Sequence, residues 1–199
     1  MRRAIGAPLL ALLLAAPLLG QGEAPCVGGQ PSAPVRIEVF SDYQCPACAV
    51  FYLDTMRAVL REYADQNKAC VVYREFPLSM HTQARPAARF GHAAMQLGKR
   101  QWATVTDALY QAQEQWALDG NVEAVVAGAL NPEDMQRVRQ MLAQPAIDAA
   151  IDADIALARR LGVNQTPTFF ITANGKTEKA AGVVQYPVLR RYLDHLLGQ

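Results

Sequence analysis

The feature that most restricts the fold of this chain is a strand, a helix and a second strand in close succession. The run Val35–Phe40 is β-branched and aromatic, and Pro46 follows where a proline suits the first turn of a helix. Apolar residues then recur every three or four positions as far as Tyr63, and Cys70–Phe76 again has strand character. Two strands joined by one helix are expected to lie parallel, with a right-handed crossover.

Beyond Pro77 the sequence becomes rich in alanine and helical in pattern. The expected helices are Gln83–Leu97, Gln101–Gln113, Val122–Leu130, Pro132–Ala143 and Ala146–Leu161. Strand character returns in Thr166–Thr172 and Glu178–Val184, which flank an Asn-Gly pair typical of a β-hairpin, and a last helix is expected over Tyr186–Leu197. We therefore expect one α/β domain interrupted by a block of helices.

The N-terminus has the composition of a secretory signal peptide. Met1–Arg3 carries positive charge, Ala4–Leu19 is apolar without a charge, and small and polar residues follow. A membrane anchor is the alternative, but the apolar run is shorter than the ~20 residues that span a bilayer and contains Pro8 and Pro17. We expect cleavage after Gly22, and hence a compartment in which disulfides persist.

The charge of the chain argues against two classes of partner. The net charge is +1, and no run rich in lysine and arginine is present. Without a basic patch there is no electrostatic basis for binding nucleic acid or an anionic membrane.

Cys45 and Cys48 lie two residues apart where the first strand passes into the helix, and three interpretations are open. A structural zinc site needs four ligands, usually in two closely spaced pairs, but Cys26 and Cys70 are isolated and the three histidines have no partner at ligand spacing. A purely structural Cys45–Cys48 disulfide would close too short a loop to constrain the unfolded chain. The third interpretation is a redox pair.

The redox interpretation has a physical basis in the position of Cys45. A sulfur at the start of a helix lies near unpaired backbone N–H groups and the positive end of the helix dipole. This environment favours the thiolate, which is the attacking species in disulfide exchange. Cys48, one turn further along, is placed to resolve a mixed disulfide, and a Cys-x-x-Cys motif in a β-α-β context is typical of such centres.

Several blocks of the chain, in order, resemble DsbA-like thioredoxin-fold proteins, which are exported thiol:disulfide oxidoreductases. The blocks are APVRIEVFSDYQCPACAVFY, REFPLSMHTQARPAARFGHAAMQLGKRQWA and GVNQTPTFFITANGK, and the similarity extends over Ala33–Leu197. It implies a thioredoxin fold, with a central mixed sheet flanked by helices and an inserted all-helical subdomain. The expected division is residues 1–22 as signal peptide, 33–76 with 166–199 as the thioredoxin-fold domain, and 77–165 as the insertion.

The resemblance also implies roles for individual residues. Cys45 would be the exposed nucleophile and Cys48 the resolving thiol, with Pro46 and Ala47 between them. Thr166 and Pro167 would form a cis-proline loop, in which the backbone of Thr166 binds an extended client segment by strand addition. The best-known oxidases of the family carry histidine where this chain has Ala47, so a weaker stabilisation of the Cys45 thiolate is expected.

Glu38 is a possible proton relay to Cys48. In relatives a like residue in the first strand has this role, but here the stretch between the strand and Cys45 is one residue longer. The alternation of the strand places Arg36, Glu38 and Phe40 on one face. The alternative is a half-exposed glutamate paired with Arg36 or another cation.

Cys26 and Cys70 are expected to form a structural disulfide. Cys70 opens the second strand and Cys26 lies shortly before the first, so both belong to the end where the parallel strands begin. Cys45 belongs to the opposite end, about 20 Å away at ~3.3 Å per residue. Two free thiols are the alternative.

The sequence thus predicts an enzyme, an exported, periplasmic thiol:disulfide oxidoreductase that acts as a dithiol oxidase on cysteine-containing client proteins. No organic cofactor or metal is expected, and the resemblance implies reoxidation by a quinone-linked membrane partner. A reductase or isomerase is the alternative within the class, although isomerases of this group usually carry a separate dimerisation domain and a monomer is expected here. From another class, a Cys-x-x-Cys pair could serve as a Cu(I)-binding module.

Overall fold

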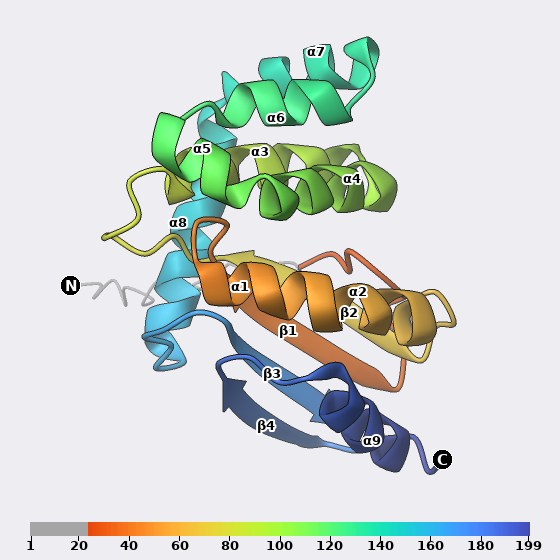
Figure 1. Cartoon of the computed structure of the whole chain (residues 1–199). Helices are drawn as coiled ribbons and strands as arrows, with labels where there is room; N and C mark the ends of the chain where they lie inside the picture. The colour runs from red at the N-terminus through yellow and green to blue at the C-terminus, as the bar shows by residue number, and fades with distance from the viewer. Residues whose placement is uncertain (1–23) are drawn as a thin grey trace, which may run out of the picture.

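The structure, a computed structural model, describes residues 24–199, and the expected signal peptide lies outside them. A four-stranded mixed sheet forms the centre of the fold, in the order β2-β1-β3-β4 (Figure 1). The strands are β1 (Val35–Ser41), β2 (Ala69–Glu75), β3 (Thr168–Ala173) and β4 (Lys176–Ala181). Strands β1 and β2 are parallel and the other pairs antiparallel. This confirms the expected thioredoxin-like α/β architecture.

Strand β1 is central and covered on both faces, as its apolar sequence requires. Val35, Ile37 and Val39 face the main core, while Phe40 belongs to a second cluster on the other face with Phe76 and Ala158. Helix α8 (Pro145–Arg160) covers this second face beside β2. The side chains of β1 therefore divide by the two-residue period of a strand between two separate cores.

The helix after β1 is continuous from Pro46 to Ala64 but alternates between α-helical and π-helical turns. Its parts are α1 (Pro46–Phe51), η1 (Tyr52–Met56), α2 (Arg57–Val59) and η2 (Leu60–Ala64). The apolar stripe expected from the sequence is buried along its whole length, from Cys48 to Tyr63. Helix α9 (Tyr186–Leu196) packs against this helix and lies with it on one face of the sheet (Figure 1).

Between β2 and β3 the chain forms a block of helices, at the top of Figure 1, followed by α8. These helices are α3 (Ala84–Leu97), α4 (Lys99–Gln111), α5 (Gln113–Asp119), α6 (Val122–Ala129) and α7 (Pro132–Leu142). The sequence did not predict α5 as a separate helix. Gly91 of α3 lies against the ring of Tyr43, and a Cβ there would overlap the phenol. A glycine therefore lets the insertion approach the loop that contains Cys45.

The C-terminal hairpin is tighter than the sequence suggested. Ala173 pairs with Lys176, so the loop consists of Asn174 and Gly175, which both have positive φ (52° and 74°). Two-residue loops of this kind match the twist of the strands. Strand β4 therefore begins at Lys176 and not at Glu178. Within residues 24–199, no helix combines the length and the apolar character needed to cross a membrane.

Candidate functional site

Cys45 is the residue that caps the N-terminus of α1. Its backbone is extended (φ −77°, ψ 119°), Pro46 opens the helix, and no side chain accepts from the first free N–H groups. The backbone N–H of Cys45 donates to the Asp42 carbonyl at 3.1 Å, which closes the turn between β1 and α1. The strand and the helix thus place the sulfur where the sequence predicted, beside the unpaired N–H groups of a helix start.

The two thiols differ in environment. Cys45 is 8% exposed and Cys48 is 1% exposed, so Cys45 is less open than the sequence suggested but more accessible than Cys48. A hydrogen bond from the Cys48 thiol, together with the backbone N–H groups of Cys48 and Ala47, lowers the pKa of the Cys45 thiol to about 5. Burial raises the pKa of the Cys48 thiol well above its ordinary value. The pair therefore consists of one thiolate and one protonated thiol at neutral pH.

The loop before β3 lies directly against Cys45. The Thr166–Pro167 peptide bond is cis, and the Cys45 sulfur lies 3.5 Å from the Thr166 carbonyl oxygen, to which it can donate when protonated. Thr166 itself is 9% exposed. The structure thus brings together Cys45, Cys48, Pro46, Ala47, Thr166 and Pro167 from segments more than a hundred residues apart.

Asp42 holds the turn that precedes Cys45. One carboxylate oxygen accepts from the backbone N–H of Gln44 at 2.7 Å, and the other from that of Leu78 at 2.8 Å. The second oxygen also lies 2.7 Å from Nδ1 of His81. The Gln44 side chain in turn accepts from the N–H of Gln83 at 2.7 Å. The segment after β2 is therefore attached to the Cys45 turn by side-chain contacts that the sequence did not reveal.

Gln113 of α5 also contacts this turn. Its side-chain nitrogen donates to the carbonyl oxygens of Tyr43 (2.6 Å) and Cys45 (3.0 Å), and the residue is 7% exposed. Sequence analysis missed Gln113, because only the folded chain brings this position to the motif. Helix α5 thus contacts the backbone of Cys45 directly.

The position of Glu38 contradicts the expected relay. Its carboxylate accepts from Nε of Arg74 at 2.6 Å, and Arg74 also binds Asp154 of α8 at 2.9 Å. This face of β1 is the one covered by α8, whereas Cys48 packs with Val39 on the opposite face. By the alternation of the strand Glu38 shares the face of Phe40, and its ion pair with Arg74 corresponds to the alternative of a half-exposed glutamate paired with a cation.

Cys26 and Cys70 are joined by a disulfide at the other end of the sheet. Their Cα atoms are 5.4 Å apart, and 44 residues separate them in the sequence. The adjoining N-terminal segment pairs with β2 as well, since the N–H of Val27 donates to Val71 O at 2.7 Å and Val71 N–H to Gly28 O at 2.9 Å. Cys45 and Cys48, by contrast, are free thiols.

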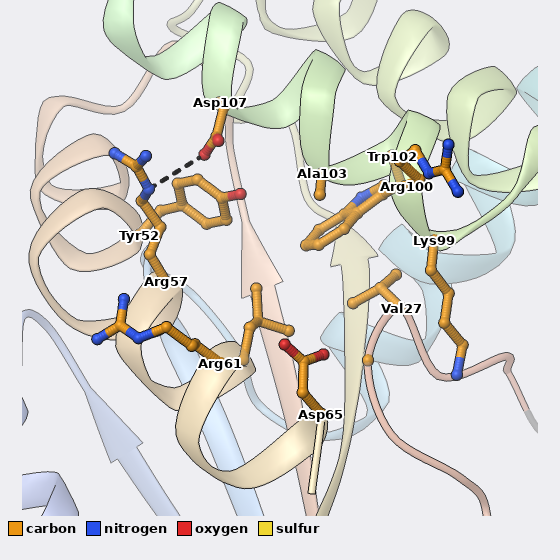
Figure 2. Close-up of a pocket in the computed structure, with 12 residues that line it drawn as sticks. Val27, Tyr52, Arg57, Arg61, Asp65, Lys99, Arg100, Trp102, Ala103 and Asp107 are labelled. Carbon is orange, nitrogen blue, oxygen red and sulfur yellow. Dashed lines mark ion pairs between the residues drawn. The ribbon is translucent and has the colours of Figure 1, made fainter.

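Two cavities border the α1–α2 helix. One, of about 420 Å³, lies beside the active-site end of the helix and is lined by Pro46, Ala49, Val50 and residues 110–115. The other, of about 310 Å³, lies toward the far end; Figure 2 shows Tyr52 and Trp102 on its walls and Arg57 paired with Asp107 at 3.3 Å. Only the first cavity adjoins the Cys45 segment.

The described residues do not gather ligands for a metal ion. Within 24–199, no group of three or more histidine, cysteine, aspartate or glutamate side chains is arranged to hold one. The chemical feature of this site is therefore the contrast between the two thiols, together with the backbone of the cis-proline loop.

Comparisons with known proteins agree with this geometry. The family model described as Thioredoxin matches residues 22–192. The probable disulfide bond formation protein D of Bacillus cereus is 25% identical over 150 residues, which cover 73% of this chain and 69% of that protein. Among solved structures, Pseudomonas aeruginosa DsbA2 is 28% identical with a TM-score of 0.63, covering 85% of this chain and 92% of that one. Wolbachia pipientis alpha-DsbA1 is similar in fold, with a TM-score of 0.69 at 22% identity over 85% and 89% of the two chains.

Proposed function

Because the chain belongs to the DsbA-like family of thioredoxin-fold oxidoreductases, we propose that it oxidises pairs of thiols in exported, cysteine-containing client proteins. Thiol:disulfide exchange follows from the family, and the direction of electron flow is the proposal. The observation that carries it is the contrast between Cys45, whose pKa is lowered, and Cys48, whose pKa is raised. Stabilising the Cys45 thiolate stabilises the reduced enzyme, which makes its disulfide the stronger oxidant.

The reaction proceeds in two exchanges. A client thiolate attacks Sγ of Cys45 in the Cys45–Cys48 disulfide, the bond between the two enzyme sulfurs breaks, and Cys48 leaves as a thiolate that takes up a proton. A second client thiolate then attacks the client sulfur of the mixed disulfide, and Cys45 leaves as a stable thiolate. The client has lost two electrons and two protons, and the enzyme is left reduced.

The cis-proline loop positions the client for this attack. The backbone of Thr166 lies beside Cys45, so an extended client segment bound along it would present its cysteine to the Cys45 sulfur. Such contacts read the backbone of the client and suit many sequences. The site of action would be the periplasm, after removal of the signal peptide, and a quinone-linked membrane partner would accept the two electrons from the reduced monomer.

The experiment that tests this direction is an equilibrium titration of the Cys45–Cys48 pair against glutathione. We expect a potential between about −120 and −270 mV, the span between the strongest oxidant of the family and thioredoxin. The same protein should oxidise reduced ribonuclease. A potential more negative than that of thioredoxin would indicate a reductase, and stoichiometric Cu(I) binding without exchange activity would indicate a metal-binding module.

Ala47 should limit the oxidising strength. Alanine provides neither a donor nor a charge, so the Cys45 thiolate depends on the Cys48 thiol and on backbone N–H groups. We expect Ala47→His to lower the Cys45 pKa below about 5 and to move the potential toward the oxidising end, each 30 mV corresponding to about 1.4 kcal/mol. Thiolate absorbance against pH measures the Cys45 pKa, and the glutathione titration measures the potential. Ala47→Gln, polar but uncharged, is the matched control, and an unchanged potential in Ala47→His would contradict the prediction.

A further inference from the structure

The cavity of about 420 Å³ beside the active-site end of α1 is joined to the Cys45 turn by two of its lining residues. Pro46 directly follows Cys45, and Gln113 donates from its side chain to the Cys45 carbonyl at 3.0 Å. The volume falls within the range of ~300–1,000 Å³ that is typical of ligand pockets. A chain that places its cysteine against Cys45 therefore passes beside this cavity.

One wall of the cavity is apolar and partly open to solvent. It is formed by Pro46, Ala49 and Val50 of the α1 helix, and Val50 is 46% exposed. Leu118 of α5 is 90% exposed and lies one helical turn after Glu114, on the same face of that helix. A ligand that covers these side chains would be stabilised by the removal of apolar surface from water.

The wall that the end of α4 and the start of α5 contribute is polar. Gln111, Glu114 and Gln115 are exposed there, and Glu114 is the one charged residue among the described residues that line the cavity. Within residues 24–199, these three side chains form no hydrogen bond and no ion pair. The carboxylate and the two amide oxygens are hydrogen-bond acceptors. This wall therefore offers one negative charge and several acceptors to a cation that donates hydrogen bonds.

The segment around this wall is acidic. Six acidic residues and neither lysine nor arginine occur in residues 101–136; the acids are Asp107, Glu114, Asp119, Glu123, Glu133 and Asp134. Arginines pair with Asp107, Glu123 and Asp134, but no cation of the described chain pairs with Glu114 or Asp119. A positively charged group at the cavity is therefore attracted, and a negatively charged one is repelled.

The cavity and the cis-proline loop lie on different sides of Cys45. Figure 1 shows α5 above the start of α1, and β3, which follows Pro167, below it. A client segment that runs along Thr166 and presents its cysteine to Cys45 therefore continues toward the cavity. Because an extended chain advances ~3.3 Å per residue, a client residue close to the reacting cysteine reaches the cavity.

We infer that this cavity binds a lysine or arginine side chain that lies close to the reacting cysteine of a client. The carbon stem would cover Pro46 and Val50, and the charged end would meet Glu114. Long basic side chains match this combination, since their apolar stem ends in a cation. The site would distinguish between clients whose backbone the cis-proline loop reads alike. The inference rests on the proposed function and names a substrate preference of the same centre.

The test is the rate at which short dithiol peptides reduce the oxidised full-length mature protein. The peptides differ in one residue, lysine or glutamate, placed in turn at each position on either side of the reacting cysteine. For each enzyme, the rate with the lysine peptide is divided by the rate with the glutamate peptide. Comparing this ratio between enzyme variants removes the influence of the charged residue on the thiol pKa of the peptide itself.

The wild type should favour the lysine peptide at one or more positions near the cysteine. Glu114→Gln, which keeps the size of the side chain, should lower the ratio roughly two- to fivefold, the effect of one exposed ion pair. Glu114→Lys should lower it further. The difference between the wild type and Glu114→Gln should shrink at high salt, because salt screens exposed charges.

Glu133→Lys is the matched control, because it changes the net charge by the same amount as Glu114→Lys. Glu133 is also exposed in the first turn of a helix, but α7 packs against α3, α6 and α8, at the top of Figure 1. This variant should keep the wild-type ratio. Equal ratios in the wild type and Glu114→Lys, or an equal fall in Glu133→Lys, would overturn the inference. If the wild type oxidised no peptide, whatever its charge, the proposed function would be wrong and the inference with it.

Discussion

Replacing Cys45 with serine should abolish disulfide exchange, whereas replacing Cys48 with serine should trap clients as mixed disulfides. The physical reason is the difference between the two sulfurs. Cys45 has a lowered pKa and lies against the Thr166 carbonyl, while Cys48 is protonated and buried. Without Cys48, the mixed disulfide formed through Cys45 has no internal thiol to resolve it.

The measurement is non-reducing electrophoresis of each variant after incubation with a client protein. The client has a single cysteine, which is activated as a mixed disulfide with a chromophore. Cys48→Ser should accumulate a covalent complex that dithiothreitol releases, and Cys45→Ser should form none. The double variant Cys45→Ser/Cys48→Ser is the matched control for reaction at Cys26 or Cys70. A complex that forms through Cys48 in the Cys45→Ser protein would reverse the assigned roles.

Removing the Cys26–Cys70 disulfide should destabilise the protein strongly and leave exchange activity intact. The cross-link joins residues 44 apart, for which loop entropy predicts about 4 kcal/mol as an upper value. For a chain of this size, losing that much stability lowers the melting temperature by about 10 °C. Activity should persist because Cys70 lies near the start of β2, and Cys45 follows the far end of the parallel strand β1.

Thermal unfolding and client oxidation of Cys26→Ala/Cys70→Ala provide the two readouts. The backbone pairing of Val27 and Gly28 with Val71 should keep the N-terminal segment in place, so the double variant should still fold at moderate temperature. Ser32→Ala, at an exposed position between Cys26 and β1, is the control for substitution in this segment. Loss of exchange in a double variant that remains folded would mean that Cys26 and Cys70 form a second redox centre.

The local pattern of the sequence was sufficient for the β-α-β unit, the Asn-Gly hairpin and the redox motif. Each depends on residues close together in the chain: strand alternation in Val35–Phe40, helical spacing from Cys48 to Tyr63, and the positive φ values that Asn174 and Gly175 tolerate. The position of Cys45 at a helix start follows from the same local signals. The environment of its sulfur, and hence the direction of its pKa shift, could therefore be anticipated.

Contacts between distant segments, however, were decided only by the tertiary structure. The family resemblance suggested Glu38 as the relay, but a side chain changes face with every residue of a strand, and Glu38 lies on the face where it pairs with Arg74. Glu75 lies opposite Ser41 because of the register between β1 and β2, and Gln113 reaches the carbonyl of Cys45 because α5 packs over it. Register and helix packing depend on which surfaces are buried together, and the spacing of residues along one segment does not contain that information.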